Sequence, residues 1–224
     1  MSPGASTRRA RKHSQSSAKR SQARRTAAAG KLRTRGQRRK FVVIGLVLIV
    51  GLAVGYGIAN REKLTETIRS VTLPLRHEDV IVDEADEHNV PPDLIAAVIF
   101  TESKFRDQTS EAGARGLMQI TPPTAEIIEE LSGGTNFNLE DLSDPDVNIA
   151  YGTFYLRHLL DKFGGNETAA LAAYNGGETN VASWGGSDLR LDDIQFPETR
   201  DYVEKVLEKR EDYREHYRDQ LDLD

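Results

Sequence analysis

The chain of 224 residues contains no cysteine, so it forms neither a disulfide bond nor a cysteine-based metal site. It has five histidines, and no two of them have the spacing of a metal-ligand pair: His13, His77, His88, His158 and His216. The sequence also lacks a phosphate-binding glycine loop and any other cofactor fingerprint. We therefore expect no metal and no cofactor.

Acidic residues are missing from the first 59 residues of the chain, and the last 19 of these lack basic residues as well. Residues 1–40 carry 14 Lys and Arg but no acidic residue, and residues 41–59 carry no charge at all. Residues 60–224 hold the other 16 basic residues and all 35 acidic ones, a net charge of −19. A single isoelectric point therefore describes none of these three parts.

The basic segment 1–40 has almost no large apolar residue, so it cannot bury a core and is predicted to be a disordered tail. Its charge suits contact with anionic lipid heads. Nucleic-acid binding is not expected, because no aromatic residue is interleaved with the basic ones and no folded binding motif is visible.

Residues 41–59 form an uninterrupted run of apolar or small side chains, about as long as a helix that crosses a bilayer. The basic tail directly before it predicts a single-pass membrane protein with a cytoplasmic N-terminus and an extracytoplasmic domain. Small residues at Gly57 and Ala59 leave a cleaved signal peptide and secretion as the alternative. The length of the run favours the uncleaved anchor.

The remainder is predicted to be a mostly α-helical domain over 77–213, joined to the membrane helix by a linker, 60–76, and followed by a charged, frayed tail, 214–224. No alternating strand pattern of useful length occurs. Proline and capping signals place the expected helices after Pro91-Pro92, at 122–132, from Asp144-Pro145 to Gly164-Gly165, at 167–174 and at 199–213.

Glu102 is the first candidate for chemistry, because it follows the apolar segment 94–100 and starts near the edge of the core. Loss of hydration there would raise the pKa of its carboxyl group, which could then donate a proton near neutral pH. Its position alone favours an ordinary solvated glutamate at a helix end.

Three short motifs, taken together, resemble a known family. Glu102-Ser103, Gly116–Gln119 and Ala173–Asn175, in this order and spacing, are similar to the soluble lytic transglycosylase (SLT) catalytic domains, which cleave peptidoglycan and have a goose-lysozyme-like fold. The resemblance covers roughly residues 84–206. It implies a lysozyme-like domain in which Glu102 is the catalytic acid. One departure is visible, since Arg106-Asp107 stands where the family usually has Asn-Pro.

The resemblance also implies a set of substrate-binding residues: Ser110, Met118, Gln119, Tyr174, Asn175 and Glu198. In the family the tyrosine reaches the catalytic glutamate. Other interpretations remain open for four of them. Ser110 could be a turn hydroxyl, and Met118 could fill the core. Tyr174 could be an ordinary buried tyrosine with a satisfied hydroxyl, and Glu198 could serve only to complement a helix dipole.

The family reaction needs no second carboxylate, because the C6 hydroxyl of N-acetylmuramic acid attacks its own anomeric carbon and leaves a 1,6-anhydro end. The resemblance therefore implies a lyase that breaks the β-1,4 bond between N-acetylmuramic acid and N-acetylglucosamine. Two alternatives stay open. One is a lysozyme-type hydrolase helped by Asp107 or Glu198. The other is a wall-binding module without catalysis.

Overall fold

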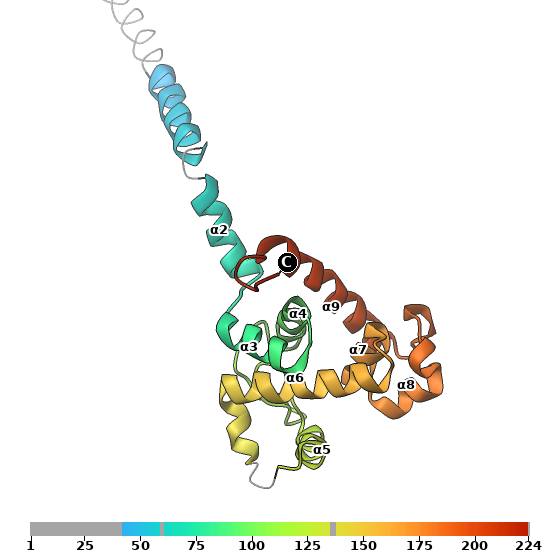
Figure 1. The fold of residues 1–224 in the computed structure, drawn as a ribbon. Helices are drawn as coiled ribbons and strands as arrows, with labels where there is room; N and C mark the ends of the chain where they lie inside the picture. Colours follow the sequence, from blue (N-terminus) through green and yellow to red (C-terminus); the bar gives the residue numbers. More distant parts are fainter. Residues whose placement is uncertain (1–41, 59–60, 135–137, 224) are drawn as a thin grey trace, which may run out of the picture. The chain divides into compact units, whose positions relative to one another are not determined.

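The computed structural model describes residues 42–58, 61–134 and 138–223, and Figure 1 shows their helices. The predicted basic tail, 1–40, lies outside the described residues. The chain divides into two compact units, Met1–Thr65 and Glu66–Asp224.

In the first unit, residues 42–58 form a helix whose large apolar side chains are 54–74% exposed. Residues 41 and 59, the ends of the predicted membrane span, are not among the described residues. Within the described ranges, no helix combines the length and the apolar character needed to cross a membrane.

The expected linker 60–76 is mostly helical, since α2 spans Arg61–Thr72. Residues 61–72 contain neither glycine nor proline, so nothing within α2 stops the helix, and Pro74 follows shortly after its end. The segment that follows is held to the domain. The hydroxyl of Tyr213 donates to the Pro74 carbonyl at 2.6 Å, and that of Tyr217 donates to the Leu73 carbonyl at 2.6 Å.

The second unit is built of helices, which confirms the predicted mostly α fold. They are α3 Glu78–His88, α4 Pro92–Ser103, α5 Pro122–Ser132, α6 Pro145–Lys162, α7 Glu167–Gly176, α8 Glu178–Trp184 and α9 Pro197–His216, with three short 3₁₀ turns. Among the described residues there is no β-strand, only two isolated bridges in the loop after α4.

The capping signals place the helix starts correctly. Thr121 accepts a hydrogen bond from the Thr124 amide, Asp144 from the amides after Pro145, and Asn166 from the Ala169 amide. Each cap satisfies an amide that has no partner within its helix. The helices α5, α6 and α7 therefore begin where the sequence predicts.

The C-terminal segment differs from the expected frayed tail. Helix α9 begins at Pro197 and runs to His216, and the residues after it turn back so that Leu221 is fully buried. The physical reason is the hydrophobic effect. Leu221 joins the main hydrophobic cluster, and burial of its side chain holds the segment against the domain although the neighbouring residues are charged.

Helix α4 is the centre of the domain, and its residues from Leu94 to Ile99 have no exposed surface. It packs most extensively against α9, and the two lie side by side in Figure 1. All members of the hydrophobic cluster fall between Leu73 and Leu221, so the unit 66–224 has a core of its own and can fold without the first unit. Glu102, near the end of α4, emerges at the edge of this core.

Candidate active site

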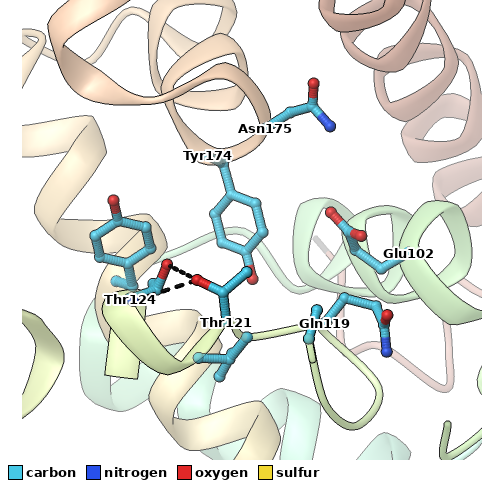
Figure 2. Close-up of a pocket in the computed structure, with 9 residues that line it drawn as sticks. Glu102, Gln119, Thr121, Thr124, Tyr174 and Asn175 are labelled. Carbon is cyan, nitrogen blue, oxygen red and sulfur yellow. Dashed lines mark hydrogen bonds between the residues drawn. The ribbon is translucent and has the colours of Figure 1, made fainter. Parts of the chain in front are cut away.

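An open pocket of about 210 Å³ lies at the end of α4, and Figure 2 shows the residues around it. Its wall is drawn from α4, the following loop, the start of α5, and helices α6 and α7. The lining residues are Glu102, Ala114, Gln119, Ile120, Thr121, Thr124, Tyr155, Tyr174 and Asn175. The predicted residues Glu102, Gln119, Tyr174 and Asn175 are thus brought together.

The Glu102 carboxyl points from α4 into this pocket, toward Tyr174 and Asn175 (Figure 2). Burial raises its pKa from 4.5 to about 7, because the charged form loses hydration. The Tyr202 hydroxyl and the Lys205 ammonium oppose the rise. The result is a carboxyl group that exchanges a proton near neutral pH.

Tyr202, on the first turns of α9, is only 9% exposed and lies beside Glu102. Its hydroxyl is close enough to lower the pKa of the carboxyl, yet it forms no hydrogen bond of standard geometry with any described residue. Tyr202 is therefore placed to stabilise the ionised form of Glu102.

Asn148 of α6 fixes the loop that faces Glu102. Its side chain is fully buried and makes three hydrogen bonds. Its Oδ1 accepts from the Met118 amide at 2.7 Å, and its Nδ2 donates to the carbonyls of Arg115 at 3.0 Å and Leu142 at 2.9 Å. Because each partner is a backbone group, Asn148 sets the path of the loop rather than a side-chain orientation.

The loop approaches α6 so closely that two positions require glycine. A Cβ atom on Gly116 would lie 2.2 Å from the Asn148 amide nitrogen, and one on Gly152 would lie 2.2 Å from the Met118 sulfur. Gln119 adopts a left-handed backbone with φ of 50°, which is uncommon for a residue other than glycine. Such strain is found at functional sites more often than elsewhere.

Tyr174 and Asn175 are held by neighbours across the pocket. The Tyr174 hydroxyl donates to the Met118 carbonyl at 2.9 Å, so its ring is fixed against the loop. Burial, followed by the charge of Glu102, raises its pKa well above 10, and the hydroxyl stays protonated. The Asn175 carbonyl oxygen accepts from the Thr199 hydroxyl at 2.9 Å.

Three predicted substrate-binding residues do not line this pocket. Ser110 accepts a hydrogen bond from the Ala114 amide at 3.0 Å and so closes a turn. Met118 is fully buried, and only its backbone is used by Asn148 and Tyr174. Glu198 is exposed on the first turn of α9.

Several pocket residues were not singled out from the sequence for a role in the site. Thr121 and Thr124 share a hydrogen bond at 2.8 Å, and the Tyr155 hydroxyl donates to Glu178 at 3.2 Å. Thr121 was recognisable only as a helix cap, while Tyr155 and Tyr202 carry apolar helical spacing that is typical of core residues. Their position beside Glu102 follows from packing between distant helices, which no local pattern signals.

No cluster of three or more metal-ligating side chains occurs among the described residues. The pocket holds one ionisable acid surrounded by hydroxyl and amide groups. Such a lining suits a polar, uncharged ligand rich in hydroxyl and amide groups, and it offers that ligand one proton donor.

These features, a helical domain with one partly buried carboxyl at the wall of an open polar pocket, are consistent with a lysozyme-like domain. Residues 79–196, more than half of the chain, match the transglycosylase SLT domain family. The chain belongs to that family.

Similar proteins include the soluble lytic murein transglycosylase of Escherichia coli K12, which is 35% identical over 143 residues, or 60% of this chain and 22% of that protein. Among solved structures, the 70 kDa soluble lytic transglycosylase of E. coli has a TM-score of 0.63 at 32% identity, over 75% of this chain and 28% of the other. An inactive glutamate-to-glutamine mutant of Slt from Pseudomonas aeruginosa has a TM-score of 0.62 at 34% identity, over 66% and 25%. The chain thus spans about a quarter of these relatives.

Proposed function

We propose that this protein is a peptidoglycan lytic transglycosylase with Glu102 as its catalytic acid and base. The bond cleaved is the β-1,4 link between N-acetylmuramic acid and N-acetylglucosamine. The family, the lysozyme-like fold and the names of the relatives support this proposal. The inactive Slt mutant, in which a glutamine replaces a glutamate, agrees with a single essential carboxyl.

The reaction would use Glu102 twice. The protonated carboxyl first donates its proton to the glycosidic oxygen as the bond from that oxygen to C1 of the muramyl residue breaks. The resulting carboxylate then takes the proton of the muramyl C6 hydroxyl, whose oxygen forms the new bond to C1. Because the nucleophile belongs to the substrate, it is already at high effective concentration. The product is a 1,6-anhydro end, and no water is consumed.

The observation that carries the proposal is the pocket's single acid. Glu102 is the only carboxylate among the residues that line the pocket in the described structure, and its pKa is raised to about 7. A hydrolase of the usual kind would place a second carboxylate across the scissile bond. Asp107 and Glu198, the two candidate helpers, are exposed and lie outside the lining.

Product analysis separates the candidate functions. Peptidoglycan digested with residues 66–224 should yield anhydromuramyl ends, and the Glu102→Gln variant should yield none while keeping the fold. Reducing ends would instead establish a hydrolase. Tight binding to peptidoglycan without any turnover would establish a wall-binding module.

We also propose that the apolar segment 41–59 holds the enzyme at the cell membrane, with residues 1–40 in the cytoplasm and the domain outside. Support comes from the exposed apolar side chains of helix 42–58 and from the basic segment before it. High salt should release a variant that lacks residues 1–59 from the membrane fraction, whereas the full chain should stay there, because salt screens surface charge but does not extract a membrane-spanning helix. Retention there, with unchanged effect on the wall, would contradict the proposal.

A further inference from the structure

A second pocket, of about 510 Å³, lies between the end of α2 and the end of α4, apart from the residues around Glu102. Its lining includes three cationic side chains, Arg76, Lys104 and Arg106. None of the three forms an ion pair with any residue that the structure describes. Three unpaired cations around one hollow are unexpected in a region whose net charge is −19.

The local backbone holds two of these cations at the pocket wall. Lys104 and Phe105 are consecutive residues with left-handed backbones, φ 54° and 57°, so the chain turns sharply after α4. The Phe105 side chain, 2% exposed, enters the core beside Tyr213. Lys104 and Arg106, the two neighbours of the buried Phe105, therefore remain exposed at the surface. Arg106 is also the residue at which this chain departs from the usual family sequence.

The opposite wall is equally well fixed. It consists of the last turn of α2 and the segment after it, including Thr72 and Pro74. Pro74 is held by the Tyr213 hydroxyl, and the Thr72 hydroxyl donates to the Ile68 carbonyl at 2.9 Å. The Tyr213 contact thus attaches this wall to α9, and a wall that is already held in place lowers the entropic cost of binding.

Apolar groups beside the cations indicate which kind of anion would fit. Val71 lines the pocket and is 77% exposed, and Ile68, one turn earlier on α2, is 54% exposed. Phe100 adds an apolar wall. Exposed aliphatic side chains next to Lys and Arg are typical of segments that lie in the headgroup region of a bilayer, where cations contact phosphates and apolar groups enter the acyl boundary.

We propose that this pocket binds the phosphate group of an anionic phospholipid, so that residues 66–224 contact a membrane surface through it. A free phosphate ion offers the same charge but gains nothing from Val71 and Ile68. The inference does not depend on the reaction at Glu102, and vesicle binding tests it without any measurement of glycan cleavage.

The first test is co-sedimentation of residues 66–224 with vesicles of phosphatidylglycerol and phosphatidylcholine, compared with phosphatidylcholine alone. Preferential binding to the anionic vesicles is expected. Arg106→Gln should weaken it about fivefold, since one basic residue near such a surface contributes that much. Arg190→Gln is the control, because its side chain is 81% exposed, lies outside the pocket and is paired with Asp193. It should change binding less than twofold.

A second pair of variants tests the apolar contribution. Val71→Ser should weaken binding to anionic vesicles about fivefold, because it removes two methyl groups from the contact. Leu131→Ser, which alters a 44% exposed residue on α5, should have no such effect. All four variants should retain glycan cleavage of soluble fragments.

Four results would overturn the proposal. The first is equal binding to neutral and anionic vesicles, and the second is equal weakening by the control and pocket variants. The third is weaker binding of Arg106→Gln to inorganic phosphate while its binding to vesicles is unchanged. The fourth is weaker binding of that variant to purified peptidoglycan alone. The third result would assign the pocket to a free ion and the fourth to the wall.

Discussion

Replacing Glu102 with glutamine should stabilise the folded domain, and the gain should depend on pH. The folded pKa of Glu102 is raised from 4.5 to about 7, so the folded state holds its proton more tightly than the unfolded chain. Stability from this group is therefore present below pH 4.5 and is lost as the pH rises toward 7. Glutamine has the same shape and no charge, so it avoids the loss.

The size of the gain follows from the same shift. At 1.36 kcal/mol for each pKa unit, the penalty on the wild type is about 1 kcal/mol at pH 5 and about 3 kcal/mol at pH 8. Glu102→Gln should therefore be more stable than the wild type by about these amounts. The advantage of the variant is larger at pH 8 than at pH 5 because the wild-type carboxylate is ionised at pH 8 and is poorly solvated in its pocket.

Urea unfolding of residues 66–224 at both pH values provides the assay. Trp184 is the single tryptophan, is 9% exposed and packs edge-on against Phe196, so its fluorescence should report unfolding. Glu126→Gln, an exposed carboxyl on α5, is the control and should change stability by less than about 0.5 kcal/mol. A gain for Glu102→Gln that is equal at pH 5 and pH 8, or absent at pH 8, would refute the reasoning.

Three further variants test how the site is built. Asn148→Ala should lower the free energy of unfolding in urea by about 3 kcal/mol, because it leaves buried backbone groups without partners. The control Asn138→Ala, at an exposed helix cap, should lower it by about 1 kcal/mol or less. Equal losses would show that the loop does not depend on Asn148. Gly152→Ala should lower stability by about 1–3 kcal/mol, since its Cβ would overlap a methionine sulfur, and an unchanged midpoint would contradict the close packing. Tyr202→Phe should move the alkaline fall in cleavage rate to higher pH, because the hydroxyl lowers the pKa of Glu102; a fall at unchanged pH would exclude that role.

Local signals in the sequence predicted most of the fold. Proline and cap residues mark the starts of α5, α6 and α7, because a cap bonds an amide only two or three residues away. Helix α2 and the buried Leu221 were not expected. Both lie in segments whose charged residues resemble a linker or a tail, and their structure is supported by Tyr213 and Tyr217, which are distant in sequence from α2.

In the candidate site, too, some features could be predicted from the sequence and others depend on tertiary packing. The motif around Glu102 singled out the one carboxylate that lines the pocket in the described structure, and its raised pKa agrees with the burial expected from the apolar segment before it. The roles of Tyr202 and Asn148 depend on where α9 and α6 meet the loop after α4. Such contacts are set by tertiary packing, so spacing along the chain does not reveal them.

The central claim is that Glu102 cleaves glycan strands without a water nucleophile. Mass spectrometry of peptidoglycan digested with wild-type protein and with the Glu102→Gln variant tests it most directly. Anhydromuramyl ends from the wild type alone are predicted. Reducing ends from the wild type, or anhydromuramyl ends from the variant, would contradict the account.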